Sequence, residues 1–177
     1  MQAYLLSAEL FWTLSSRPST TGRSFLKLTL GNVLLAFDAL AAANASAGGT
    51  HWAEAQRLEA EWEAQRARWA VHVEAKARRE LTSRLRQWQA YVEDVIEAHT
   101  AEDDAGNVRP RLVAEQLLDV LPEGPETAHL REQLAQLDGR IDPFLQRAPF
   151  VLDPALQSRY AEAAYPFLYR RSRSASA

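Results

Sequence analysis

Histidine and glutamate are the side chains of this sequence best suited to bind a metal ion. Metal sites in helical bundles use two Glu-x-x-His pairs together with further glutamates, whereas this chain has one such spacing, from Glu126 to His129. That glutamate lies in the first turn of an expected helix, where the positive helix end favours it. His51, His72 and His99 have no second ligand at metal-binding spacing. The absence of cysteine excludes thiolate sites, disulfides and cysteine nucleophiles. No metal or cofactor is therefore expected.

Arg66 and His72 suggest a different chemistry, the hydrolysis of RNA. They are separated by five residues, and this spacing resembles the motif of helical HEPN-type ribonucleases, in which a histidine follows an arginine after about four to six residues. A polar residue usually follows the arginine in that family, whereas this chain has Ala67. On one unbroken helix the two side chains would also point about 120° apart. A HEPN-like ribonuclease is therefore the least favoured of three possible functions.

Residues 57–88 combine three tryptophans with eight basic side chains. A stacking surface for single-stranded nucleic acid needs both kinds of group on one face. The apolar positions recur about every 3.7 residues and keep one bearing along the helix, with Arg68, Arg79 and Arg86 on the opposite side. We therefore predict that the tryptophans are buried and the arginines are exposed. The predicted core stripe consists of Trp62, Trp69, Val73, Leu81, Leu85 and Trp88.

Charge is unevenly distributed in this chain, although its net charge is only −3. Residues 66–86 hold seven basic and two acidic side chains, a local charge of +5, and residues 93–104 hold six acidic side chains and no basic one. A basic tail with Arg170, Arg171 and Arg173 ends the chain. Together with the three helical arginines, these are the candidate residues for contact with an acidic partner or with phosphate.

The most apolar segment, Phe25–Ala47, reads as a buried helix rather than a membrane span. It is interrupted by polar residues, whereas a span needs about 20 nearly uncharged residues. Asp38 shares its bearing with Lys27 and is assigned to the solvated side of this helix, and Asn32 to the apolar side. The N-terminus lacks the basic start of a signal peptide. We expect a cytoplasmic protein, and the excess of arginine over lysine, 18 to 2, suggests a GC-rich bacterial genome.

Prolines and hydrophobic periodicity predict the elements that carry these residues. None of the eight prolines lies between 19 and 109, so this part of the chain can form long helices. We predict a first helix over residues 3–14, a second over 30–45 with Thr29 as its N-cap, and a long helical segment over 52–98.

The segment 52–98 is longer than a compact domain of this size. Its 47 residues would span about 70 Å as one helix, whereas the whole domain should be about 40 Å across. The helix must therefore bend, break or protrude. The Thr82-Ser83 step is the expected place for a break, because either hydroxyl could cap a new helix. A protruding helix would expose its apolar stripe and require a partner chain.

The last third of the chain is expected to consist of shorter pieces. Pro110 and Pro125 are each placed at the start of a helix, and the second helix has apolar residues at spacings of 4, 3 and 4. The Asp-Pro steps at 142 and 153 predict two further helical turns.

These observations predict an all-α, mainly antiparallel helical bundle with one long central helix and an irregular C-terminal third. Residues 1–169 are expected to form a single helical domain and residues 170–177 a flexible basic tail. The favoured function is a non-catalytic assembly, adaptor or scaffold protein that acts through helix surfaces on another protein or on a second copy of itself. The alternative is a nucleic-acid-associated protein that uses the arginine face. No membrane contact is expected.

Overall fold

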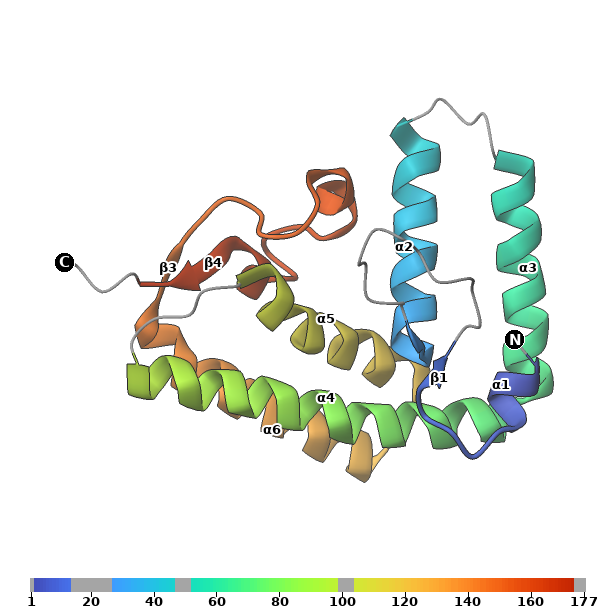
Figure 1. Ribbon diagram of the computed structural model, residues 1–177, viewed down its shortest axis with the longest axis horizontal. Helices are drawn as coiled ribbons and strands as arrows, with labels where there is room; N and C mark the ends of the chain where they lie inside the picture. Colours follow the sequence, from blue (N-terminus) through green and yellow to red (C-terminus); the bar gives the residue numbers. More distant parts are fainter. Residues whose placement is uncertain (1, 14–26, 47–51, 99–103, 174–177) are drawn as a thin grey trace.

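Most of the described chain is helical, as Figure 1 shows. The computed structural model describes residues 2–13, 27–46, 52–98 and 104–173. The α-helices are α1 (Gln2–Leu6), α2 (Leu30–Ser46), α3 (Trp52–Arg68), α4 (Ala70–Ala98), α5 (Asp104–Val120) and α6 (Pro125–Ile141). The strands are β1 (Trp12–Thr13), β2 (Lys27–Leu28), β3 (Leu145–Arg147) and β4 (Arg170–Ser172), and the 3₁₀ helices are η1 (Asp142–Phe144), η2 (Pro154–Arg159) and η3 (Pro166–Tyr169). The prediction of an all-α fold with a long helix is confirmed, because the described strands form only two two-stranded antiparallel sheets.

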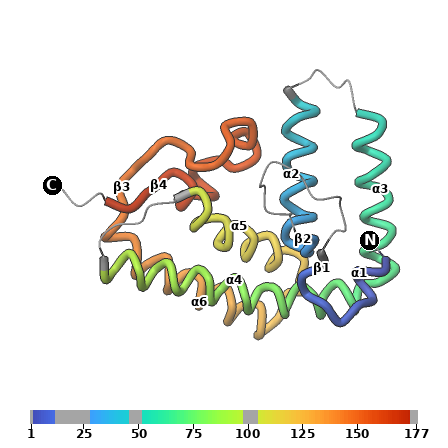
Figure 2. Tube along the Cα trace, viewed as in Figure 1, coloured from blue at the N-terminus to red at the C-terminus, as the bar shows by residue number. Residues whose placement is uncertain are grey.

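The helices are arranged in two groups (Figures 1 and 2). α2 and α3 form a hairpin that stands across the N-terminal part of α4, and α5 and α6 pack along the rest of α4. The antiparallel order that we predict holds for α2 with α3, for α4 with α5 and for α5 with α6, whereas α3 and α4 meet at a steep angle (Figure 1). α4 and α6 run parallel, because Arg78 contacts Glu126 at 3.1 Å and Trp88 donates a hydrogen bond to Asp138 at 2.9 Å further along both helices.

The long helical segment breaks at Trp69, so the expected break at Thr82-Ser83 is wrong. The Trp69 N–H donates to the Gln65 carbonyl at 3.0 Å, and its own carbonyl accepts from Val73 at 2.9 Å. The residue thus completes the last turn of α3 and begins α4, and the chain changes direction there (Figure 1). At the expected site, the Thr82 hydroxyl instead donates to the Arg78 carbonyl within α4 at 3.0 Å. The 29 residues of α4 span about 44 Å, so no 70 Å helix protrudes.

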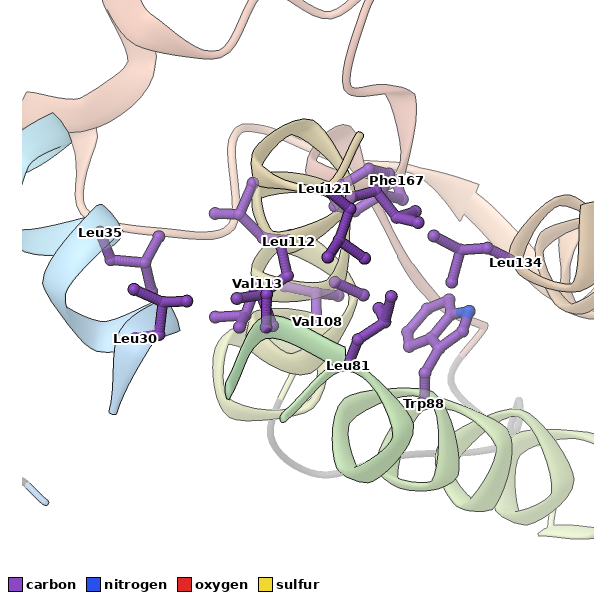
Figure 3. Packing of buried hydrophobic residues seen from close by; sticks show 14 of the residues in the cluster. Leu30, Leu35, Leu81, Trp88, Val108, Leu112, Val113, Leu121, Leu134 and Phe167 are labelled. Carbon is purple, nitrogen blue, oxygen red and sulfur yellow. The ribbon is translucent and has the colours of Figure 1, made fainter. Parts of the chain in front are cut away.

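Packing explains why the break falls at Trp69. On α3, Trp62 is buried and its ring lies 6.0 Å from that of Phe37 on α2. On α4, Leu81 and Trp88 point into the core shared with α5 and α6 (Figure 3). Two different neighbours therefore bury the two halves of one apolar stripe, which a straight helix could not achieve. Of the predicted core stripe, Trp62, Val73, Leu81 and Trp88 are buried, and Trp69 and Leu85 are partly buried and pack against the core.

The start of α2 is held tightly against α4 and α5. The predicted N-cap is confirmed, since Thr29 Oγ1 accepts from the Asn32 N–H at 3.1 Å. A second acceptor comes from α4, where Glu80 Oε2 takes the Gly31 N–H at 3.0 Å. A Cβ at Gly31 would lie 2.2 Å from a methyl carbon of Val113 on α5. Only glycine therefore permits this approach of α2 to α5.

Two further helix boundaries differ from the prediction. α1 ends at Leu6 rather than near residue 14, and the chain after it is held by α4, where Lys76 donates to the carbonyl oxygens of Ser7 and Glu9 at 3.1 and 2.6 Å. α5 begins at Asp104, so Pro110 lies inside the helix rather than at its start. Inside a helix, proline removes one hydrogen bond of the ladder and crowds the carbonyl four residues earlier, and burial of Val108, Leu112 and Val113 on α5 opposes this cost.

The C-terminal third is ordered further than predicted. The Asp-Pro steps form η1 and η2 as expected, and Asp153 Oδ1 accepts from the Ala155 N–H at 2.9 Å. The predicted flexible tail is wrong for residues 170–173, because β4 pairs with β3 and the Arg173 N–H donates to the Phe144 carbonyl at 3.1 Å. Residues 174–177 lie outside the described residues. No helix in the described part of the chain is both long and apolar enough to cross a membrane.

Candidate partner-binding groove between α4 and α6

A groove of about 370 Å³ lies between the parallel helices α4 and α6. It is lined by one face of each helix, because the lining positions recur at helical intervals of three, four and seven residues. The lining residues are Thr82, Leu85, Arg86 and Gln89 from α4, and Leu130, Gln133, Gln136, Leu137 and Arg140 from α6. The two faces are held in register by the Arg78–Glu126 and Trp88–Asp138 contacts described above.

The groove combines an apolar floor with polar walls. Leu85, Leu130 and Leu137 pack against the hydrophobic core and remain partly accessible. Exposed glutamines form the walls, and all three are bonded along their own helices. Gln89 donates to Glu93 at 2.8 Å, Gln133 contacts His129 at 3.1 Å, and Gln136 donates to Glu132 at 3.4 Å. An apolar floor beside hydrogen-bonding side chains can accept an amphipathic segment, with leucine-like side chains inside and polar side chains at the rim.

The charges of the groove are all positive. Arg86 and Arg140 are exposed, and neither forms an ion pair with another described residue. No carboxylate of the described residues lines the groove. Most of the other arginines of α4, α5 and α6 differ in this respect, Arg79 and Arg109 excepted. Carboxylates of the same chain pair with Arg78, Arg84, Arg111 and Arg131. The α4–α6 groove is thus a surface whose positive charge the described chain leaves uncompensated.

The structure separates the arginines that the sequence places on one stripe. Arg68 belongs to α3, beyond the break, and its guanidinium carbon lies 5.3 Å from the centre of the Trp69 ring. Arg79 donates to the Ala8 carbonyl at 2.7 Å, which ties it to the N-terminal segment. Arg86 alone of these three lines the groove. The expected continuous arginine face is therefore not formed.

The arginines of the tail are incorporated into the small β3–β4 sheet. Arg170 pairs with Asp142, and Arg173 Nε donates to the Leu145 carbonyl at 3.3 Å. Arg171 is exposed on β4. Sequence reasoning missed Arg140 of the groove, because its α6 neighbours were interpreted as one core-facing stripe. The apolar stripe of α6 is in fact divided between two environments. Leu134 and Ile141 are fully buried, whereas Leu130 and Leu137, which alternate with them, are only partly buried and line the groove.

The described residues assemble neither the ribonuclease site considered for Arg66 and His72 nor a metal site at Glu126 and His129. Arg66 lies on α3, 3.6 Å from Glu63, whereas His72 is exposed on α4, edge-on to Trp69. Glu126 pairs with Arg78 instead of facing His129 across a metal. Within the described ranges no three histidine or acidic side chains gather where they could hold a metal ion. His51 and His99 lie outside those ranges.

The sequence assigns Asp38 to a solvated face of α2, and this assignment is wrong. Its carboxylate accepts hydrogen bonds from the Tyr160 hydroxyl at 2.6 Å, from Arg159 at 3.0 Å and from the amide of Gln116. It thereby joins α2, α5 and η2. Asn32, assigned to the apolar side, is partly buried among aliphatic residues and accepts a hydrogen bond from Arg109. The assignment of Asp38 fails because the C-terminal third covers the face of α2 that carries it.

Three tyrosines hold their phenolic protons more tightly in the folded protein than in the unfolded chain. Burial, together with the charge of Glu80, raises the pKa of Tyr4 from 10.0 to about 12. Burial and the hydrogen bond to Asp38 raise the pKa of Tyr160. Burial also raises the pKa of Tyr165.

These pKa shifts predict unfolding by alkali. The unfolded chain releases the phenolic protons near pH 10. The stability that comes from the raised pKa values of the folded protein is therefore fully present below pH 10 and is lost as the pH rises towards 12. We expect tyrosinate absorbance and far-UV circular dichroism to change together in that range. Ionisation of all five tyrosines near pH 10 with the helical signal intact would contradict the burial of these three hydroxyls.

Comparison with protein-family models, with curated proteins and with solved structures finds no match to this chain. The function must therefore be argued from the chemistry of its own residues.

Proposed function

We propose that this protein is a non-catalytic helical adaptor that binds an acidic, amphipathic segment of another protein in the groove between α4 and α6. The observation that carries the proposal is the pair Arg86 and Arg140. They flank an apolar floor, face no carboxylate of the described chain, and lie in a protein whose other helical arginines are mostly paired.

The groove supports a helical partner in particular. Its floor leucines come from two parallel helices, so a third helix lying between them can insert side chains spaced by three or four residues. Carboxylates on the flanks of that helix would reach the guanidinium groups of Arg86 and Arg140. Each exposed ion pair contributes about 0.2–1 kcal/mol, so the apolar contacts would supply most of the affinity and the charges the specificity.

The nucleic-acid alternative is less well supported. A phosphate-binding surface needs several unpaired cations along one track. Here Arg68 is separated from Arg79 by the break at Trp69, and Arg79 is bound to the Ala8 carbonyl. Two arginines that no described carboxylate pairs, beside a leucine floor, suit carboxylates of an amphipathic helix better than a continuous phosphate backbone.

The test is binding of a labelled helical peptide of about four turns, with leucines along one side and glutamates at the flanking positions, measured by fluorescence anisotropy. We expect the double variant Arg86→Glu/Arg140→Glu to bind it about tenfold more weakly or worse, because two attractions become repulsions. The matched control is Arg68→Glu/Arg171→Glu, which makes the same charge change outside the groove and should leave the affinity unchanged.

Three outcomes would contradict the proposal. Equal binding of a peptide with lysines in place of the glutamates would show that the groove has no charge preference. Submicromolar binding of duplex or single-stranded nucleic acid at physiological salt, lost in the Arg86→Glu/Arg140→Glu variant, would favour the alternative function. Light scattering that shows a dimer abolished by the same variant would identify a second copy of this chain as the occupant.

A further inference from the structure

A second groove, of about 410 Å³, lies between α2, α5 and the segment that leads into η2. It shares no residue with the α4–α6 groove. Its lining is mostly aliphatic: Leu28, Val33, Leu35, Ala36, Ala39, Leu112, Leu152 and Leu156. The polar lining residues are Asn32, Arg109 and Asp153. Concave, mainly apolar sites of about 300–1,000 Å³ with a few polar groups are typical of small-molecule binding.

Small side chains on α2 leave this space open. Ala36 and Ala39 are exposed and face the groove where larger side chains would fill it. Leu112 of α5 is fully buried and forms part of the opposite wall, and Leu152 and Leu156 are only partly buried. An apolar ligand seated here would remove these aliphatic surfaces from water at about 25 cal/mol per Å².

Arg109 supplies the positive charge of the groove. One of its terminal nitrogens donates to Asn32 Oδ1 at 3.2 Å, and a guanidinium has five N–H donors in all. No described carboxylate lies within ion-pair distance of it. Asp153, the acidic residue of the lining, accepts the Ala155 N–H and thereby caps η2. Arg109 therefore retains donors for the two oxygens of a carboxylate, the group that its fork geometry fits best.

We propose that this groove binds a small carboxylic acid with an aliphatic body, with the carboxylate on Arg109 and the hydrocarbon against the leucines of α2, α5 and the 152–156 segment. The proposal is independent of the adaptor function, because Arg86 and Arg140 are not part of the site. It assigns Arg109 as a ligand-binding residue.

Isothermal titration calorimetry of the full chain tests this with octanoate, octanol and octylammonium. We expect octanoate to bind with a stoichiometry of one and about tenfold more tightly than octanol, because a hydrogen bond to a charged group contributes at least that factor. Octylammonium should bind more weakly than octanol. Arg109→Gln should reduce the octanoate affinity to that of octanol and leave octanol binding unchanged.

A second variant tests the aliphatic part of the site. Ala39→Phe places a ring in the groove from an exposed helix position, so the fold should survive, as circular dichroism can verify, and both octanoate and octanol should lose binding. Arg140→Gln serves as the control, since it removes an unpaired arginine elsewhere. Absence of octanoate binding at millimolar concentration, or equal octanoate affinity in the Arg109→Gln variant, would overturn the proposal.

Discussion

Replacing Trp88 with alanine is expected to lower the free energy of unfolding by about 3–5 kcal/mol. Trp88 is 1% exposed, and its side chain points from α4 into the core that α4 shares with α5 and α6 (Figure 3). Its ring nitrogen donates to Asp138 at 2.9 Å, and its ring lies 5.3 Å from that of Tyr91. The substitution would leave a cavity at the centre of the core and remove one of the contacts that set the register of α4 and α6.

Trp52→Ala is the matched control for this prediction. Trp52 is 56% exposed at the start of α3, so its loss should change the stability by no more than about 0.5 kcal/mol. Urea denaturation followed by circular dichroism compares the two variants. Equal midpoints would mean that the core does not centre on Trp88. The Trp88→Ala variant should also weaken peptide binding in the α4–α6 groove, because its walls would no longer be held in register.

Replacing Glu80 with glutamine is expected to destabilise the protein by about 3 kcal/mol or more, although the two side chains have nearly the same size. Glu80 is fully buried on α4. One carboxylate oxygen accepts two bonds from Arg84, at 2.7 and 3.1 Å, and the other accepts the Gly31 N–H at the start of α2. Glutamine would leave the Arg84 charge without its partner and remove a negative charge from the positive end of α2.

Glu126→Gln provides the corresponding surface control. Glu126 also pairs with an arginine, Arg78, at 3.1 Å, but the side chain of Glu126 is 63% exposed. Its loss should cost less than about 1 kcal/mol, because water screens the pair. Urea denaturation of both variants at one pH and salt concentration makes the comparison. A cost for Glu80→Gln as small as that for Glu126→Gln would show that the junction of α2 with α4 does not depend on this carboxylate.

Much of the local structure could be predicted from the sequence, because its causes lie within a few residues. Thr29 caps α2, Pro125 begins α6 and Asp153 caps η2. Each of these depends on a side chain next to the backbone group that it satisfies, so the spacing along the chain is enough. The helical periodicity likewise places Leu81 and Trp88 in the core, since a 3.6-residue repeat determines which side of a helix is apolar whatever packs against it.

The candidate groove could be predicted only in part. Arg86 was identified as an exposed arginine of α4, whereas its relation to Arg140 was not. The two residues belong to helices whose parallel packing depends on contacts such as that of Trp88 with Asp138. The same limit applies to Asp38, whose partners lie on α5 and η2. The periodicity of α2 does not indicate which later segment of the chain will cover Asp38.

The apolar faces of the helices and the starts of α2, α6 and η2 were thus determined by the sequence alone, whereas the break at Trp69 and the directions and neighbours of the helices were decided by the tertiary structure. Trp69 shows the difference. Its own sequence context allows a continuous helix, and the chain bends there because α2 buries the stripe of α3 while α5 and α6 bury that of α4. Gly31 shows it at the scale of one atom, since the Cβ that it lacks would meet Val113, a residue of another helix. Local preferences depend on side chains about one turn away along the same helix. Contacts such as that between Gly31 and Val113 exist only after distant segments of the chain have packed together.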